Sequence, residues 1–170
     1  MLEIQVRTVA AQRVVTEKKT VDQAQLMEWL PGAMGRTYEA AEAAGGWTPS
    51  NELAWLGREN LKAEPVFIVI YEGNPNEGPT EIEVCTLVAA DIPDGDGVRT
   101  IPAHQEAFAH LTRTEADPSV LGAAYEELAS WILGGGKQMA GAPREIYYTD
   151  YFGAAPDDIV CDLAWPVTGS

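Results

Sequence analysis

A single carboxylate stands among aromatic side chains in the segment REIYYT, residues 144–149. If this segment is a strand, its side chains alternate between two faces, and Glu145 shares a face with Tyr147. A carboxylate in aromatic surroundings is costly to desolvate unless another group neutralises it. A cationic aromatic ligand would supply both the charge and a flat surface for stacking or cation–π contact. The alternative is that Glu145 pairs with Arg144 or with nearby backbone and only marks the rim of a site.

A second strand-like segment, Val66 to Tyr71, supplies further aromatic residues. Like the first segment it is entered through a proline, and the two prolines align the two strands. On this alignment Phe67 and Tyr71 fall on the face of Glu145.

The opposite side of both segments is apolar. It carries Ile68 and Ile70 in the first segment and Ile146 and Tyr148 in the second. We expect this apolar set to contact the helices, because a strand between helices and solvent must bury one face. The face that carries Glu145 should then look away from the helices, toward water or a ligand.

Other residues are candidates for the same ligand site. Asp162 lies on the last strand-like segment, and Tyr38 lies on a predicted helix. Trp47 and Trp55 stand in the polar, turn-forming segment 45–60, where large aromatic side chains need something to pack on. They either wedge this segment against the helices or form a lid or wall over a ligand cavity.

Nucleophilic and metal chemistry have little support in the sequence. His104 and His110 are the only histidines, and no serine or cysteine triad is evident. We therefore predict no metal and no cofactor. Cys85 and Cys161 fall at matching places in two similar strands, and we expect both to be buried, reduced thiols.

The charge balance excludes some classes of partner. The chain has 11 Lys and Arg against 26 Asp and Glu, a net charge of −15, which speaks against nucleic-acid binding because phosphates are held mainly by basic side chains. Acidity is compatible with attraction of cationic small molecules. The longest apolar stretch, Val66 to Tyr71, is too short to span a membrane, and no export signal precedes Leu2. We expect a cytoplasmic protein.

Several short segments of the sequence occur twice, in the same order. VRTVAAQRVV, near the start, returns as VRTIPAHQEA, and VCTLVA returns as VCDLAW. Ordered repetition indicates an internal duplication. We predict a single domain over residues 1–170, with copy one at 1–92 and copy two at 97–167, and an insertion at 45–60 in copy one.

Each copy is expected to contain a strand, a helix and two further strands. Thr20 or Asp22 can cap the first helix, Pro31 suggests a break in it, and Gly45 stops it. The expected elements of copy one are strands at 4–19, 66–71 and 82–90 around that helix. Those of copy two are strands at 98–112, 144–151 and 158–165. Its helix is expected to have Asp117 as N-cap and Pro118 as first residue, and to end at the glycines 134–136. The predicted fold class is α+β, with internally duplicated β-α-β-β units forming a curved antiparallel sheet with helices on one side.

The second copy resembles the GyrI-like small-molecule-binding domain family, the effector-binding domain of AraC- and MerR-type multidrug regulators. The matching segments are RTIPAHQEAFAHL, LGAAYEELASWI, GAPREIYYTD and DDIVCDLAWPV, and the first copy matches more loosely. The resemblance implies a duplicated β-α-β-β fold and a central cavity for hydrophobic, often cationic, aromatic compounds. It also implies that Glu145 is a buried ligand contact. Asp162 stands where members often have a glutamate.

With Met1 directly before the first strand there is no helix-turn-helix, so we expect a stand-alone binding protein for hydrophobic, cationic aromatic compounds. One alternative is a hydrolase of strained, electrophilic natural products, with Glu145 or Asp162 as general acid–base. The other is a protein that interacts with DNA gyrase, and a protein partner or a homodimer is compatible with the sequence.

Overall fold

The computed structural model describes residues 2–45, 53–57, 66–95, 97–148 and 153–169. In this part of the chain, nine strands form one antiparallel sheet in the order β1-β6-β9-β8-β3-β4-β2-β5, with β7 paired to β9. The elements are β1 (Gln5–Val9), β2 (Gln12–Val21), α1 (Gln23–Ala44), η2 (Ala54–Leu56), β3 (Phe67–Tyr71), β4 (Thr80–Leu87), β5 (Val98–Ile101), β6 (His104–Thr112), α2 (Leu121–Gly134), β7 (Gln138–Met139), β8 (Arg144–Tyr147) and β9 (Ile159–Thr168).

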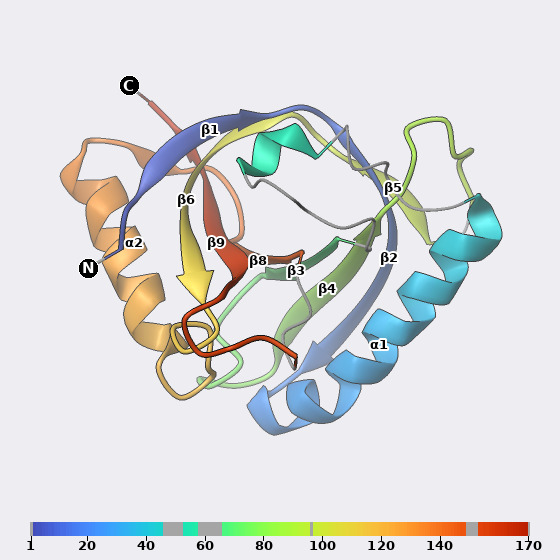
Figure 1. The fold of residues 1–170 in the computed structure, drawn as a ribbon, viewed down its shortest axis with the longest axis horizontal. Helices are drawn as coiled ribbons and strands as arrows, with labels where there is room; N and C mark the ends of the chain where they lie inside the picture. Colours follow the sequence, from blue (N-terminus) through green and yellow to red (C-terminus); the bar gives the residue numbers. More distant parts are fainter. Residues whose placement is uncertain (1, 46–52, 58–65, 96, 149–152, 170) are drawn as a thin grey trace.

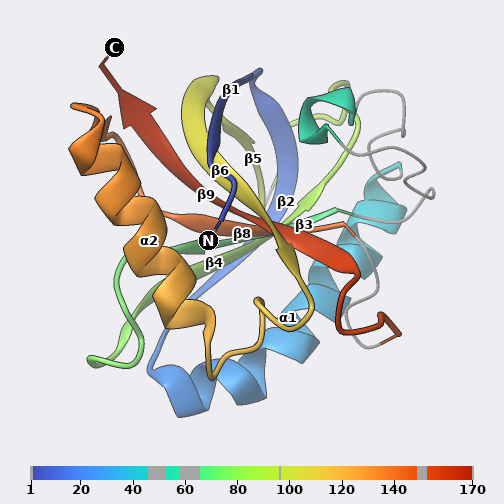
Figure 2. The ribbon, with the colours of Figure 1, turned by 60° about the vertical axis from the view of Figure 1, so that its left-hand side comes forward.

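The sheet is strongly curved, and the two long helices lie on its convex side (Figure 1). α1 packs on β2 and β4, and α2 packs on β6 and β9. Figure 2 shows the same helices outside the curve from a second direction. The short helix η2 lies within the concave side, which Figure 1 shows at the centre of the curve. The predicted α+β class, with a curved antiparallel sheet and both helices on one side, is confirmed.

Each predicted opening strand is in fact two strands. The segment 4–19 is interrupted after Val9, and the segment 98–112 is interrupted after Ile101, where Pro102 has no N–H to donate to a ladder. The short strands β1 and β5 each pair with a strand from the other half of the chain. β1 pairs with β6, while β5 pairs with β2, so each half of the chain lends an edge strand to the other half.

Helix α1 is continuous over Gln23–Ala44, so the predicted break at Pro31 is wrong. Pro31 removes one backbone hydrogen bond, but it lies on the exposed side of the helix, where water can satisfy the carbonyl that loses its donor. The helix ends as predicted at Gly45, whose φ of 135° favours glycine.

The N-terminus of α1 is held by a capping box. Gln25 N donates to the Asp22 carboxylate at 2.9 Å, and Asp22 N donates to the Gln25 side chain at 3.0 Å. We expect Asp22→Ala to lower the free energy of unfolding by about 1 kcal/mol, because the backbone N–H of Gln25 loses its side-chain acceptor. Urea denaturation would measure the loss. Asp22→Asn should retain most of the stability, and an Ala variant as stable as the parent would contradict this role.

Helix α2 begins later than predicted. Asp117 and Pro118 belong to the turns before the helix, where the Asp117 carboxylate accepts hydrogen bonds from the backbone and hydroxyl of Ser119. The first helical residue is Leu121. The helix ends at Gly134, inside the predicted glycine run, with Gly135 as its C-cap.

The core consists of apolar layers on the two sides of the sheet. The concave layer contains Ile68, Ile70, Ile146 and Tyr148, together with Leu56 of η2. On the convex side, the inward faces of the helices pack against the other residues of the same strands. The prediction that the set around Ile68 contacts the helices is therefore wrong, because that set faces η2 instead.

Candidate functional site

Glu145 lies at the centre of the sheet, on the face that the helices cover. Its strand β8 runs between β3 and β9, and its cross-strand neighbours are Val69 and Leu163. Val69 packs with Leu26 of α1, and Leu163 packs with Leu128 of α2. Glu145 is only 2% exposed. The two halves of the chain thus meet at this carboxylate, on the side of the sheet opposite to the one expected.

Three tyrosine hydroxyls donate hydrogen bonds to the Glu145 carboxylate, each from a different element. The Tyr147 hydroxyl of β8 and the Tyr71 hydroxyl of β3 lie 2.5 and 3.2 Å from Oε1. The Tyr125 hydroxyl of α2 lies 2.7 Å from Oε2. The rings of Tyr71 and Tyr125 meet edge to face, with their centroids 6.3 Å apart. We call Glu145 and these three residues the tyrosine cluster.

The electrostatics of the tyrosine cluster are those of a buried anion without a matching cation. Burial raises the pKa of Glu145, and the hydrogen bonds from Tyr147, Tyr125 and Tyr71 act in the opposite direction. The pKa values of all three tyrosines are raised well above their usual range, chiefly by burial and then by the nearby carboxylate. Their hydroxyls therefore stay protonated and remain donors.

Arg144 does not neutralise Glu145, although it is the next residue in the chain. Side chains alternate along β8, so the Arg144 guanidinium lies on the concave side. Its Nη2 donates to the carbonyl of Ala142 at 3.0 Å. Within the part of the chain that the structure describes, no ion pair involves Glu145. The alternative in which Glu145 pairs with Arg144 is wrong.

Further aromatic and apolar side chains surround the tyrosine cluster. Trp29 and Leu30 of α1 pack against the same buried group as Tyr71 and Tyr147. On the other flank, the ring of Trp165 lies edge-on to Tyr125, with a centroid separation of 6.5 Å. The residues that carry these rings are partly exposed.

The other residues predicted for the site lie in several places. Phe67 is the cross-strand neighbour of Tyr147 and shares the face of Glu145. Tyr38 lies on α1, where burial and a hydrogen bond to Glu42 raise its pKa, and it is not among the residues that hydrogen-bond Glu145. Trp47 lies outside the described residues.

Asp162 and Trp55 lie on the concave side, away from the tyrosine cluster. Asp162 is the cross-strand neighbour of Ile146 and is fully buried. Its carboxylate is bound by Arg7 Nη1 at 2.9 Å and by the Tyr148 hydroxyl at 2.6 Å. Trp55 of η2 packs over the Arg7 guanidinium, 4.9 Å from ring centroid to Cζ. Trp55 therefore wedges η2 into the concave side rather than against the helices, and Asp162 cannot share a ligand with Glu145.

The two cysteines are buried and unpaired, as the sequence predicts. They do not occupy matching places, however. Cys161 is the cross-strand neighbour of Tyr147 and faces the helices, whereas Cys85 is the neighbour of Ile68 and lies in the concave layer. Burial raises the pKa of Cys85 to about 12, so this thiol is not a nucleophile at neutral pH.

Sequence reasoning did not include Tyr125 in the site. It lies in the predicted apolar stripe of the second helix. Its hydroxyl could have indicated a place in the site, because a buried tyrosine hydroxyl needs a hydrogen-bond partner. Trp29 and Trp165 were not predicted either.

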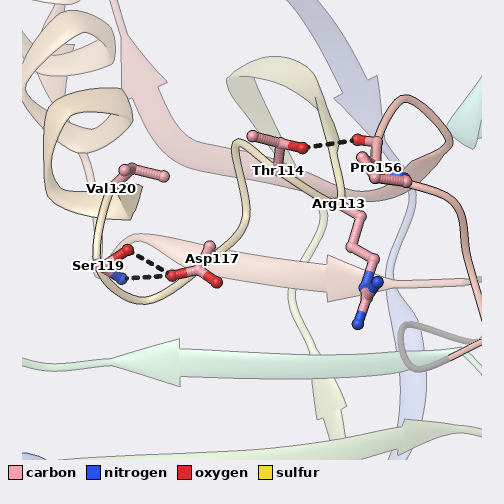
Figure 3. Close-up of a pocket in the computed structure, with 6 residues that line it drawn as sticks. All are labelled: Arg113, Thr114, Asp117, Ser119, Val120 and Pro156. Atoms are coloured by element: carbon pink, nitrogen blue, oxygen red, sulfur yellow. Dashed lines mark hydrogen bonds between the residues drawn. The ribbon is translucent and has the colours of Figure 1, made fainter.

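A surface pocket of about 310 Å³ lies apart from the tyrosine cluster, at the turns that lead into α2 (Figure 3). Its lining residues are Arg113, Thr114, Asp117, Ser119, Val120 and Pro156. None of them is a predicted site residue. Among the described residues, no group of three or more His, Cys, Asp or Glu side chains could hold a metal ion, and no helix is both long and apolar enough to cross a membrane.

A curved antiparallel sheet with both helices on one side is the fold expected from the GyrI-like resemblance. Comparison with solved structures supports this class of fold. The C-terminal domain of EcmrR superposes with a TM-score of 0.73 at 17% identity, covering 100% of this chain and 99% of that domain. This chain spans only 58% of the EcmrR chain that was solved with DNA.

Two further neighbours have the same fold. SAV2435, solved with tetraphenylphosphonium bound, matches with a TM-score of 0.54 at 19% identity over 99% of this chain and 95% of that one. A hydrolase from Listeria innocua matches with a TM-score of 0.61 at 13% identity, over 98% of this chain and 92% of that one. At these identities the likeness establishes a common fold. No protein-family model matches the sequence, and no curated protein matches it significantly.

Proposed function

We propose that this chain binds small organic cations that carry aromatic groups, and that the tyrosine cluster is their binding site. The observation that carries the proposal is that Glu145, only 2% exposed, has three hydroxyl donors and, among the described residues, no cationic partner. A buried carboxylate in this state is destabilising to the free protein. A bound cation would neutralise it, and the tyrosine and tryptophan rings would contact the ligand through their faces.

The hydrogen bonding at Glu145 indicates what the ligand must look like. Oε1 accepts from two hydroxyls and Oε2 from one, so little acceptor capacity is left for N–H donors of a ligand. The carboxylate therefore offers charge more than hydrogen bonds, which suits a delocalised or fully substituted cation. Tetraphenylphosphonium, the ligand in the SAV2435 structure, is a cation of this kind.

The hydrolase alternative has less support. It relies on Glu145 or Asp162 as a general acid–base with help from tyrosine hydroxyls. The lone pairs of Glu145 are largely occupied by its three tyrosine donors, and Asp162 is fully buried on the other face, where Arg7 and Tyr148 bind it. Because the two carboxylates lie on opposite faces of the sheet, one of them cannot activate a water molecule for attack on a ligand that is bound at the other.

Binding of tetraphenylphosphonium, measured by isothermal titration calorimetry, tests the proposal. We expect the wild-type chain to bind, and Glu145→Gln to bind at least about tenfold more weakly, because the isosteric amide keeps the shape but loses the charge. Glu81→Gln removes one charge from an exposed position and should bind like the wild type. Equal affinity in Glu145→Gln, or no binding by the wild type, would overturn the proposal.

We also propose that the two halves of the site arose by internal duplication. β3 and β8 pair antiparallel with Ile68 opposite Ile146, and each of these residues is the third after its proline. Equivalent residues face each other across an antiparallel pair only where a twofold axis passes between them. The pairing of β1 with β6 and the pairing of β5 with β2 are related by the same twofold axis, which supports the duplication.

A further inference from the structure

A second charged residue lies buried on the concave side of the sheet. Arg144 is 8% exposed, and its cross-strand neighbours there are Ile70 and Ala164. Its Nη2 donates to the Ala142 carbonyl, but its Nε has no hydrogen-bond partner. A buried guanidinium with an unused N–H is costly, because both the charge and the donor have lost water.

Other arginines on this side have carboxylate partners. Arg7 pairs with Glu106 and Asp162, each at 2.9 Å, and Arg99 pairs with Glu83 at 2.6 Å. In the described part of the chain, no carboxylate forms an ion pair with Arg144. Burial is the main reason that the pKa of Arg144 is lowered, while the more distant charges of Glu106 and Glu83 act to raise it. Arg144 is thus a buried cation to which the described residues offer no ion pair, in a chain whose net charge is −15.

We propose that Arg144 is the anion-binding residue of a second ligand site, on the face opposite the tyrosine cluster, and that this site takes an organic monocarboxylate. The planar guanidinium matches a carboxylate in geometry, and its Nε–H is available. Ile70, Ala164 and the neighbouring Phe108 belong to the concave apolar layer and suit the apolar body of such an acid. The charges of Glu106 and Glu83, which act on Arg144, would repel a dianion more strongly than a monoanion, which favours a ligand with a single negative charge.

This inference goes beyond the proposed cation site and does not depend on it. Glu145 and Arg144 are adjacent in sequence, but strand alternation sends them to opposite sides of the sheet. One strand would then present an anion to a cationic ligand on the convex face and a cation to an anionic ligand on the concave face.

Stability measurements separate a ligand-binding arginine from a structural one. We expect Arg144→Met to melt at the same temperature as the wild type or a few degrees higher, because it removes an unpaired buried charge and keeps the length of the side chain. Arg99→Met is the matched control. It leaves Glu83 without its partner and should melt several degrees lower. A loss in Arg144→Met as large as that in Arg99→Met would make Arg144 structural and overturn the proposal.

Ligand binding is tested with sodium benzoate and sodium hexanoate in a thermal-shift titration, with benzamide as the uncharged control and inorganic phosphate as the competing anion. We expect both carboxylates, and neither control, to raise the melting temperature of the wild type and not that of Arg144→Met. Tetraphenylphosphonium should bind Arg144→Met as it binds the wild type. The absence of a carboxylate effect, its persistence in Arg144→Met, or a preference for phosphate would each overturn the assignment.

Discussion

Replacing Arg7 by methionine is expected to lower the free energy of unfolding by about 3–5 kcal/mol. The Arg7 side chain is 9% exposed, and it is shared between two carboxylates, Glu106 and Asp162, that are themselves buried. Its guanidinium also stacks on Phe108, 3.9 Å from Cζ to the ring centroid. Methionine keeps part of the apolar contact but leaves both carboxylates without this cation.

The consequences of losing Arg7 extend to the architecture. Arg7 lies on β1, the edge strand that the first half lends to the second, and its ion pairs connect β1 to β6 and β9. Burial alone would raise the pKa of Glu106, but the hydrogen bond from His104 and the charge of Arg7 outweigh burial and lower it. In the Arg7 variant, the Glu106 carboxylate keeps the hydrogen bond from His104 but loses the charge of Arg7, which also helps to keep it ionised.

Thermal denaturation would measure the effect of the Arg7 substitution. For a chain of this size the expected loss corresponds to a decrease of about 10 °C in melting temperature. Arg36→Met is the control, because it also removes an arginine from an ion pair, with Glu17, but at an exposed position where such pairs add little. Equal melting temperatures for Arg7→Met and Arg36→Met would show that the concave network does not stabilise the fold.

Strand alternation in the sequence places Glu145 with Tyr147 and Tyr71, but it cannot decide which side of the sheet they face. Both faces of β3 are buried, Ile68 on one and Val69 on the other, so neither face has the polar pattern of a solvent-exposed surface. The helices cover one face and η2 covers the other. The insertion that contains η2 has no periodicity, so its position under the concave side was not predictable from the sequence.

The register of β9 was the second feature that the sequence could not supply. The similar segments VCTLVA and VCDLAW suggest that Cys85 and Cys161 occupy equivalent positions in the two copies, yet the two thiols face opposite sides of the sheet. A shift of one residue in strand pairing moves every side chain to the other face. The same shift decides the role of Asp162, which becomes a partner of Arg7 rather than a second acid beside Glu145.

The affinity for tetraphenylphosphonium is expected to increase with pH, by up to about tenfold per pH unit, until Glu145 is ionised in the free protein. Burial raises the pKa of Glu145 above the ordinary value of 4.5, and a cation binds preferentially to the ionised form. The ligand has no titratable group. The other groups that face Glu145, namely Tyr71, Tyr125, Tyr147 and Cys161, have pKa values raised well above their usual range, so they stay protonated near neutral pH.

The sign of the pH effect on stability is opposite to that on affinity. The folded state holds the Glu145 proton more tightly than the unfolded chain does, so this residue makes the free protein less stable as the pH rises from 4.5 through the raised pKa. A bound cation removes that penalty and releases the proton. Calorimetry in buffers of different ionisation enthalpy would detect the released proton in this pH interval and none well above it. In Glu145→Gln the residual affinity should not depend on pH, and a wild-type affinity that stays constant as the pH is lowered from neutral to 4.5 would show that Glu145 is not the group that binds the cation.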